Sequence, residues 1–221
     1  MNKYSSIKKV CKINDGIFSD IIDSFNNHGF KTEKEIADFI LKRFKQLNVK
    51  PAFPSIVANN KWEIHPLPRK KKLEKGFLIL DFGCKLREYC SDMTRTIFLG
   101  KPNAFEKRLY ELVLRCQRKS VKGIKIGMRY RELDRNARKM LKHYRKYFVH
   151  SLGHGVGKQV HEKPAISRNS DDVCRENDFI TIEPGIYIPG KFGIRIEDTI
   201  FIGKKVEVLT RARKDLIFLK A

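Results

Sequence analysis

Residues 77–99 read FLILDFGCKLREYCSDMTRTIFL, in which the polar residues KLRE separate two largely apolar segments. Apolar segments of this length on either side of a polar turn are typical of a β-hairpin. A turn at Leu86-Arg87 would place Asp81 directly opposite Asp92, on the same face of the hairpin. Their Cβ atoms would then lie about 4.5–5.5 Å apart. The stretch therefore predicts a hairpin that brings two carboxylates together.

The paired carboxylates need an explanation, because facing like charges destabilise a sheet and a bare carboxylate is costly to bury in an apolar strand. A cation between Asp81 and Asp92 would resolve both difficulties. Alternatively, Asp81 caps a turn and Asp92 pairs with Arg95. The first hairpin alone does not decide between a metal site and this structural interpretation.

A second acidic hairpin is predicted near the C-terminus, where Glu183 in FITIEPGIYI and Glu197 in IRIED lie on either side of PGKFG. The two glutamates do not fit a tight turn register. We therefore expect neighbouring strands without direct pairing, with a bulge at Pro184-Gly185. Asp198 alternates to the opposite face and is expected to be a solvent-facing or structural carboxylate.

Between the two hairpins lies the segment VHSLGHGVGKQVHEKP, which holds three of the six histidines, His150, His154 and His161. Gly153 and Gly155 flank His154, and glycine lets the backbone approach another group closely. Imidazole is a common ligand of transition metals. Four carboxylates and one neutral imidazole balance the charge of two divalent cations, so the combination favours a dinuclear metal centre.

The N-terminal residues have the apolar spacing of an amphipathic helix from Ile7 to Phe25, which Asn27-His28-Gly29 ends. Asn14 is a polar gap in the apolar stripe. Because glycine costs about 1 kcal/mol in a helix interior, Gly16 marks the place where a kink would occur.

Three further helices are predicted. Thr32 and Glu35 form a capping box for the second helix, whose expected buried stripe consists of Ile36, Phe39, Ile40, Phe44 and Leu47. The third helix has Leu109, Leu112, Val113 and Cys116 on one stripe, and the fourth covers about residues 131–146.

The predicted elements run in the order helices, hairpin, helices, hairpin, which indicates an α+β protein. The turn Gly29-Phe30-Lys31 before the second helix resembles Gly127-Met128-Arg129 before the fourth. We interpret this similarity as a sign of duplication, with two α/β halves around a common centre. No linker interrupts the chain, so we expect one domain over residues 1–221.

The composition has one outlier, a net charge of +22 from 47 basic and 25 acidic residues among 221. A solvated basic face is favoured over a nucleic-acid site, because no nucleic-acid motif accompanies the charge. The run Arg69-Lys70-Lys71-Lys72 is expected to be a solvated loop. There is no apolar stretch of about 18 residues that could span a membrane. The N-terminus also lacks a secretory signal, so a cytoplasmic location is expected.

The five cysteines are Cys11, Cys84, Cys90, Cys116 and Cys174. Their number is odd and no C-x-x-C occurs, so neither a disulfide framework nor a thiolate zinc site is indicated. We expect reduced thiols.

Several motifs together resemble a known family. YCSDMTRT, HSLGHGVGKQVHE, FITIEPGIYIPG and GIRIEDT occur in this order, with FPSIVANN upstream. They are similar to the Xaa-Pro aminopeptidase and prolidase branch of the pita-bread metallopeptidases, which is related to methionine aminopeptidase. The resemblance extends from the first helix to about Gly203. It implies the pita-bread fold, with pseudo-twofold α/β halves around a curved antiparallel sheet. It also implies that residues 1–221 are a single catalytic domain, without the separate N-terminal domain that this branch usually has.

The resemblance also implies a site. Two divalent ions, manganese or cobalt in the first place and zinc or iron as alternatives, would be held by Asp81, Asp92, His154, Glu183 and Glu197. His65, His150, His161 and Arg195 match substrate positions. The implied catalytic roles are a proton carrier for Glu183, an oxyanion donor for His161 and a substrate contact for His65. Arg195 is expected to clamp a carboxylate or to pair with Asp198 or Glu197.

The expected activity is hydrolysis of the N-terminal peptide bond of peptides, preferentially before proline. A prolidase-type dipeptidase, a methionine aminopeptidase and a non-catalytic pita-bread module that binds RNA or the ribosome are the alternatives. The expected partners are a peptide substrate and, weakly and non-specifically, nucleic acid or the ribosome. We expect no membrane association and a monomer or small homo-oligomer.

Overall fold

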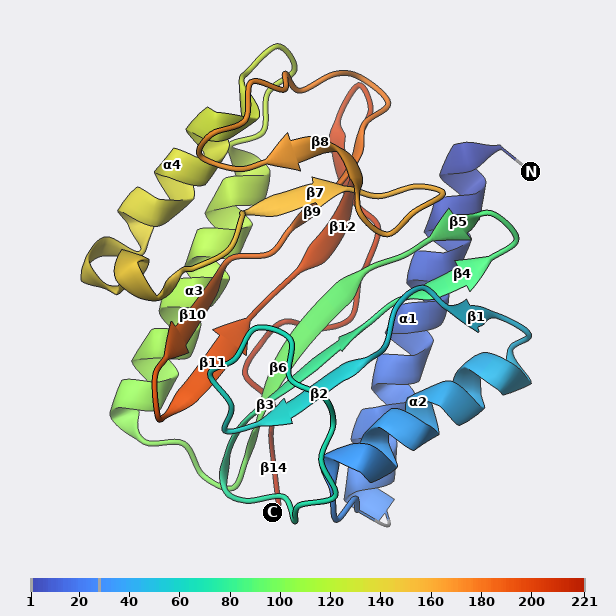
Figure 1. Ribbon diagram of the computed structural model, residues 1–221, viewed down its shortest axis with the longest axis vertical. Coiled ribbons are helices and arrows are strands. Elements are labelled where there is room, and N and C mark those ends of the chain that lie inside the picture. The colour runs from blue at the N-terminus through green and yellow to red at the C-terminus, as the bar shows by residue number, and fades with distance from the viewer. Residues whose placement is uncertain (1, 28, 221) are drawn as a thin grey trace.

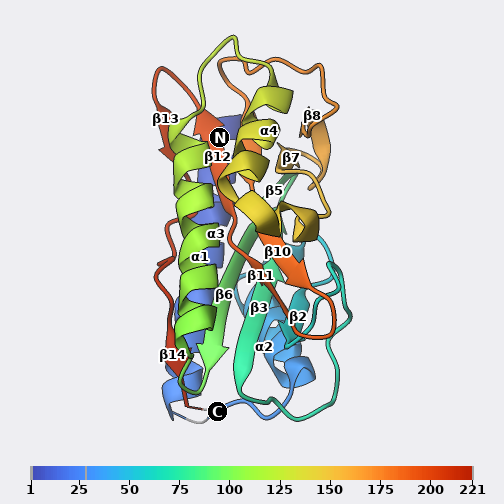
Figure 2. The same cartoon turned by 90° about the vertical axis from the view of Figure 1, so that its left-hand side faces the viewer.

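Residues 2–27 and 29–220, which the computed structural model describes, form four α-helices and one short 3-10 helix: α1 (Lys3–Asn27), α2 (Glu33–Gln46), α3 (Ala104–Lys122), α4 (Tyr130–Met140) and η1 (Lys142–Tyr147). Figure 1 shows α1 and α2 on one side of the strands and α3 and α4 on the other. In the turned view of Figure 2, the long helices α1 and α3 lie beside the strands as a separate layer.

The helix α1 is continuous through Asn14 and Gly16, so the possible kink is not present. Asn14 is fully buried and its Nδ2 donates a hydrogen bond of 3.1 Å to the carbonyl oxygen of Phe82. The polar gap in the stripe therefore joins the helix to a strand. Gly29 has the left-handed φ of +70° that was predicted after the helix, whereas His28 lies outside the described residues.

The helix α2 begins as predicted, because the Thr32 side chain accepts a hydrogen bond from the backbone N–H of Glu35. The Glu35 carboxylate accepts from the N–H of Lys31 rather than from that of Thr32, so the capping box is not the reciprocal one. The predicted stripe is buried at Ile36, Ile40 and Phe44, but Leu47 is 42% exposed because the helix has ended at Gln46.

The predicted fourth helix is two elements, since α4 ends at Met140 and the 3-10 helix η1 follows. Lys142, the first residue of η1, has a φ of +52°, which no α-helix can accommodate. The third helix, α3, buries Leu109, Val113 and Cys116 as predicted.

The strands form four small sheets, all antiparallel apart from the pairing of β14 with β6. The first half contributes β1 (Lys50–Pro51), β2 (Ile56–Asn59), β3 (Gly76–Phe82), β4 (Cys84–Leu86), β5 (Tyr89–Cys90) and β6 (Met93–Leu99). The second half contributes β7 (Gly153–Gly155), β8 (Glu162–Ile166), β9 (Phe179–Ile182), β10 (Gly185–Ile188), β11 (Phe192–Arg195), β12 (Asp198–Ile202), β13 (Val206–Val208) and β14 (Phe218–Leu219).

The register of the first hairpin differs from the predicted one. Asp81 faces Thr94, and Leu86 faces Tyr89. The turn therefore lies one residue later than expected, and Asp92 is two positions away from the place opposite Asp81. Because the shift is by two residues, both carboxylates stay on the same face of the hairpin.

The second hairpin needs no bulge, which corrects the prediction. Gly185 faces Arg195 in one ladder, and Ile182 faces Asp198 in the next. The register is therefore the same on both sides of the gap between the ladders, which contains residues 183–184 and 196–197. Glu183 and Glu197 lie in this gap between the ladders. The strands β10 and β11 are joined by the three-residue turn Pro189–Lys191, so the register of a tight two-residue turn does not apply.

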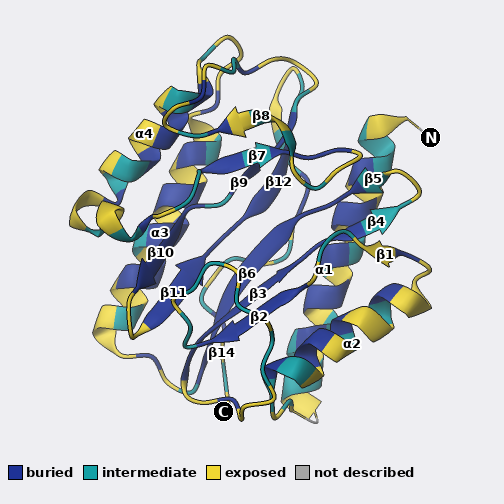
Figure 3. Ribbon diagram, in the orientation of Figure 1, coloured by how far each residue is buried: buried dark blue, intermediate teal, exposed yellow. Residues whose placement is uncertain are grey.

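The two largest apolar clusters of the core lie one against α1 and α2 and the other against α3 and α4. Leu78 and Leu80 of β3 belong to the first cluster, and Phe77 belongs to the second. Figure 3 shows the central strands buried and the exposed residues on the outer faces of the helices. The alternation along β3 places Asp81 on the same face as Phe77, away from α1 and α2.

The basic run after β2 is only partly the solvated loop that was predicted. Lys70, Lys71 and Lys72 are exposed, whereas Arg69 binds the buried carboxylate of Glu33 with both its Nε and its Nη2. All five cysteines are free and buried, in agreement with reduced thiols. No described helix is long and apolar enough to cross a membrane.

Candidate metal centre

The two acidic hairpins and the histidine segment meet at one cavity of about 270 Å³. Its lining includes all five predicted metal ligands, which come from residues far apart in the sequence: Asp81, Asp92, His154, Glu183 and Glu197. Within each of three groups of three side chains, the possible metal-ligating atoms lie within 4.8 Å of one another. The groups are Asp81, Asp92 and Glu197; His154, Glu183 and Glu197; and Asp92, His154 and His161.

The backbone around His154 is held closely by neighbouring strands. A Cβ added at Gly153 would lie 2.0 Å from the carbonyl oxygen of Thr181, and one at Gly155 would lie 2.1 Å from that of Lys163. Any larger residue would clash with the backbone at both positions. The two glycines therefore allow β7 to fit between its neighbours β8 and β9, and they fix where the imidazole projects.

Three buried carboxylates of the cavity each keep one oxygen without a hydrogen-bond partner among the described residues: Asp81 Oδ1, Asp92 Oδ1 and Glu197 Oε1. A buried charged oxygen without a partner is very costly. Carboxylate oxygens and imidazole nitrogen are suitable ligands for divalent cations such as manganese. The donor set therefore fits the divalent ions that were predicted.

Burial, and then mutual repulsion, raises the pKa of two carboxyl groups in this cluster. Burial raises the pKa of Asp92, and the neighbouring carboxylates Glu197 and Asp81 raise it further. Burial also raises the pKa of Glu197, with Glu183 and Asp81 adding to the effect. Without a bound cation, the cluster therefore holds protons in place of positive charge.

His154 and Glu183 form the opposite case, since Nε2 and Oε1 lie 3.3 Å apart. Burial alone would lower the pKa of His154, but the contact with Glu183 outweighs it and raises the pKa to about 9. Burial would raise the pKa of Glu183, but His154 lowers it to about 2. In the metal-free protein this pair is an ion pair, and a metal ion would take the place of the proton on His154.

The four predicted substrate residues surround the centre, although not all line its cavity. His65, His161 and Arg195 do line it. His150 stands beside it, with Nδ1 3.9 Å from Oε2 of Glu183 and Nε2 3.0 Å from the Tyr187 hydroxyl. Burial lowers the pKa of His150 to about 4, so its imidazole is neutral near pH 7.

Arg195 is buried and most of its donors are already engaged. Its Nη2 pairs with Asp81, its Nη1 donates to the Tyr187 hydroxyl and its Nε donates to Thr94 Oγ1 at 3.1 Å. The predicted ion pair with Asp198 or Glu197 is therefore wrong, because β11 directs the guanidinium toward Asp81 instead. Arg195 fixes one oxygen of Asp81 and leaves the other free.

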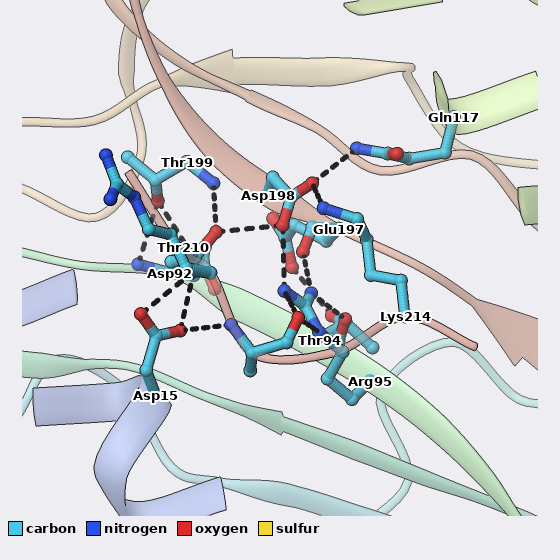
Figure 4. A network of polar contacts seen from close by, with 12 residues as sticks. Asp15, Asp92, Thr94, Arg95, Gln117, Glu197, Asp198, Thr199, Thr210 and Lys214 are labelled. Atoms are coloured by element: carbon cyan, nitrogen blue, oxygen red, sulfur yellow. Dashed lines mark hydrogen bonds and ion pairs between the residues drawn. The ribbon is translucent and has the colours of Figure 1, made fainter. Parts of the chain in front are cut away.

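A buried polar network lies directly behind the ligands (Figure 4). Thr94 Oγ1 contacts Glu197 Oε2 at 2.6 Å, and Arg95 donates to the backbone carbonyl of Glu197. Asp198 is fully buried and receives hydrogen bonds from four side chains: Arg95, Gln117, Thr210 and Lys214. Of the two alternatives predicted for Asp198, the structural carboxylate is therefore confirmed and the solvent-facing one is wrong.

Sequence reasoning missed several residues around the centre. Tyr187 contacts both His150 and Arg195, and Phe53, Ile56 and Leu67 form an apolar wall of the cavity. One signal was available for the network, because Arg95 lies within the apolar strand MTRTIFL and a charged residue there needs a buried partner.

Comparison with known proteins identifies relatives of this architecture. Residues 5–204 match the model of the metallopeptidase family M24. The Xaa-Pro dipeptidase of Pyrococcus furiosus is 40% identical over 218 residues, and that of Pyrococcus horikoshii is 42% identical over 218 residues. Each comparison covers 96% of this chain but 62% of the relative, so the chain spans about three fifths of these relatives.

Solved structures show the same fold. The prolidase from Pyrococcus horikoshii OT3 superposes with a TM-score of 0.92 at 39% identity, covering 97% of this chain and 63% of that one. The X-Pro aminopeptidase from Thermotoga maritima gives 0.91 at 34% identity, covering 98% and 63%. The predicted α+β pita-bread fold is confirmed, and the chain belongs to the metallopeptidase family M24.

Proposed function

We propose that this chain hydrolyses the N-terminal peptide bond of peptides, preferentially before proline, with two divalent metal ions. The observation that carries the proposal is the convergence of three partnerless buried carboxylate oxygens, from Asp81, Asp92 and Glu197. His154 and Glu183 would complete the ligand set. Manganese or cobalt is proposed first, with zinc or iron as alternatives, because oxygen-rich sites suit several of these ions.

The bound ions would polarise the scissile carbonyl and make a coordinated water acidic enough to attack near neutral pH. Glu183 lies beside His154 and within the cavity, so it can receive a proton from the attacking water and pass it to the leaving amine. His161 lines the same cavity and is exposed. Burial lowers its pKa, so near pH 7 its neutral imidazole can donate a hydrogen bond to the developing oxyanion.

The remaining residues of the cavity would hold the substrate. Phe53, Ile56 and Leu67 offer an apolar wall that suits a proline ring. His65 projects from the same loop as Leu67 and would contact the substrate beside it. His150, held by Tyr187, would orient the peptide at the edge of the cavity.

A Xaa-Pro dipeptidase is the second candidate, and the names of the two Pyrococcus relatives favour it. A dipeptide ends in a carboxylate directly after proline. Arg195 has five N–H donors, and contacts with Asp81, Tyr187, Thr94 and the carbonyl oxygen of Ile64 leave one of them to clamp that carboxylate. We therefore propose cleavage of longer peptides ahead of cleavage of dipeptides. We also propose that the region matching the family acts as one catalytic domain.

A substrate panel tests the proposal. The protein is reconstituted with manganese, cobalt or zinc and given Ala-Pro, Ala-Pro-Ala-Ala and Met-Ala-Ala-Ala. We expect the longer proline peptide to be cleaved in preference to the methionyl peptide. Preferential removal of methionine would overturn the proline specificity. Failure to retain stoichiometric transition metal after reconstitution would overturn the enzyme proposal itself.

A further inference from the structure

A strongly basic hollow of about 520 Å³ lies where α4 and η1 meet the loop after β8. Six of its seven lining residues are cationic: Arg135, Arg138, Lys139, Arg145, Lys146 and Arg168. No carboxylate lines it in the part of the chain that the structure describes. Between Arg129 and His150 the sequence holds eight lysines and arginines but two acidic residues, so the hollow is a concentrated part of the basic surface.

Most of these cations have no acidic partner. Arg138 is the exception, since its Nε lies 2.6 Å from Asp134 and its guanidinium donates to the carbonyl oxygens of Phe148 and His150. The other five make no ion pair within 4.0 Å with any described residue. Unneutralised cations that line one concave surface produce a positive potential that attracts acidic ligands.

A second hollow links the basic hollow to a residue beside the candidate metal centre. A neighbouring hollow of about 500 Å³ shares Arg138, Arg145, Lys146 and Arg168 with it and extends along residues 148–151 to His150. His150 in turn lies 3.9 Å from the metal-centre residue Glu183. The basic surface therefore begins at the edge of the cavity in which the peptide bond would be cut.

We propose that this basic hollow binds acidic side chains of a peptide substrate, several residues beyond the proline. The inference rests on the proposed peptidase activity and specifies its substrate class. An extended peptide advances about 3.3 Å per residue, so a segment that leaves the cavity past His150 can bring its following residues to Arg145, Lys146 and Arg168. Glutamate or aspartate there would pair with the free cations.

Single-stranded RNA fits the hollow less well than an acidic peptide. Binding of RNA usually combines cations with exposed aromatic side chains on which bases stack. Among the residues that line the two hollows, Phe148 is the aromatic one besides His150, and it is 2% exposed. The hollows therefore offer charge without a stacking surface.

Two peptides that differ only in charge test the proposal, Ala-Pro-Gly-Glu-Glu-Glu and Ala-Pro-Gly-Gln-Gln-Gln. Exposed ion pairs contribute about 0.2–1 kcal/mol each, so three of them should raise kcat/KM for the acidic peptide about tenfold at low salt, mainly through KM. The double variant Arg145→Glu/Lys146→Glu should abolish this preference and cleave the glutamine peptide as the native protein does. High salt should reduce the preference in the native protein.

The matched control is Lys42→Glu/Lys45→Glu, which makes the same charge change on exposed residues of α2, on the other side of the molecule (Figure 1). It should keep the preference for the acidic peptide. Equal kcat/KM for the two peptides in the native protein, or equal effects of the two double variants, would overturn the proposal.

Fluorescence anisotropy with labelled peptides separates this inference from the peptidase proposal. If the glutamine peptide is not cleaved by metal-loaded protein, the peptidase proposal fails, whereas tighter binding of the acidic peptide to native protein than to Arg145→Glu/Lys146→Glu would still support the hollow. Labelled single-stranded RNA is measured in parallel. If RNA binds the native protein more tightly than the acidic peptide does at about 150 mM salt, and if Arg145→Glu/Lys146→Glu abolishes this binding, the hollow would be assigned to nucleic acid instead.

Discussion

At the scale of single residues, the metal centre is a set of half-satisfied carboxylates. Asp81 has one oxygen bound by Arg195, and Glu197 has one beside Thr94 Oγ1. The second oxygen of each is left without a partner. Each carboxylate is thus oriented through one oxygen, and the other would be available for the proposed ions. Such a site would be preorganised at a cost to the stability of the metal-free state.

This cost should depend on pH in the metal-free protein. The pKa values of Asp92 and Glu197 are raised above their unfolded values, so these groups lower stability as pH rises through the window between the unfolded and folded pKa. The pKa of His154 is raised to about 9, so its contribution is also lost between about pH 6.5 and pH 9. We expect the Tm of EDTA-treated protein to fall from pH 5 to pH 9.

Metal-loaded protein is the control, since bound cations replace the protons and should make its Tm much less dependent on pH. For a chain of this size, each lost kcal/mol lowers the Tm by about 2–4 °C, which calorimetry resolves easily. Parallel curves for the two forms would show that the carboxylates do not hold the ions.

His154→Ala should lose metal and activity together, because the imidazole is the nitrogen donor at the centre of the ligand set. Elemental analysis after manganese reconstitution should find less than the two ions expected per native chain. His143→Ala removes an exposed imidazole on η1 and is the matched control. A His154→Ala protein with its full metal content would contradict the ligand assignment.

His161→Ala should keep the metal and lose rate. Its proposed hydrogen bond forms with the developing oxyanion, and removal of such a donor lowers kcat by about 10²–10³. Steady-state kinetics on the proline tetrapeptide, with the metal content measured on the same sample, checks this. If metal is lost along with kcat, His161 acts as a ligand of the group that it forms with Asp92 and His154.

The acidic residues and His154 around the cavity were predictable from the sequence, because carboxylates inside apolar strands and a histidine between glycines have few structural explanations. His65 and His161 were predicted only through the family resemblance. The role of Arg195 was not predictable from the sequence. Its partner depends on the direction of a side chain at the end of β11, and Asp81, Asp198 and Glu197 were all compatible with the sequence. Tyr187 was missed because a tyrosine in an apolar strand is common in cores.

At the scale of elements, a predicted metal ligand lies at the start of each of the strands β6 and β12, and a buried polar network lies behind these ligands. Asp92 immediately precedes β6 and Glu197 immediately precedes β12. Behind them, Arg95 pairs with Asp198 at 2.8 Å, and Lys214 from the C-terminal segment joins the pair (Figure 4). The network links two hairpins and the C-terminal segment at the place where the ligands must be held still.

Asp198→Asn should destabilise the fold strongly. Removal of one partner from a buried ion pair leaves uncompensated charge on Arg95 and Lys214, which costs about 3–5 kcal/mol. Urea unfolding of the metal-free variant measures the loss without a contribution from metal binding. Glu88→Gln, which breaks the exposed pair with Lys158, is the control and should change the free energy of unfolding by less than about 1 kcal/mol. Equal effects would show that the network is not structural.

Periodicity predicted the type and order of most elements, but not their registers. The first hairpin turns at Arg87-Glu88, and Arg87 has a φ of +57° that its sequence does not favour. The predicted fourth helix changes to a 3-10 helix at Lys142 for a similar reason. Such left-handed positions at non-glycine residues are imposed by tertiary packing, and local sequence carries no signal for them.

At the scale of the whole molecule, the proposed metal centre lies between two halves, each with its own helices and apolar cluster. Asp81 and Asp92 come from the first half, and His154, Glu183 and Glu197 come from the second. Neither half alone holds a complete ligand set. Metal binding should therefore couple the halves, since an ion that binds only the assembled site stabilises the folded state.

The net charge of +22 leads to a last prediction about the molecule as a whole. A polyanion should bind weakly at low salt through many dispersed cations, and binding should fall by orders of magnitude between about 50 and 200 mM salt, because phosphate contacts release counterions. Anisotropy with a labelled single-stranded RNA measures this. Because the contacts are dispersed, Arg145→Glu/Lys146→Glu and Lys42→Glu/Lys45→Glu should weaken RNA binding equally, although only the first removes the preference for acidic peptides. Salt-resistant, sequence-selective binding without peptidase activity would instead make the chain a nucleic-acid-binding member of its family.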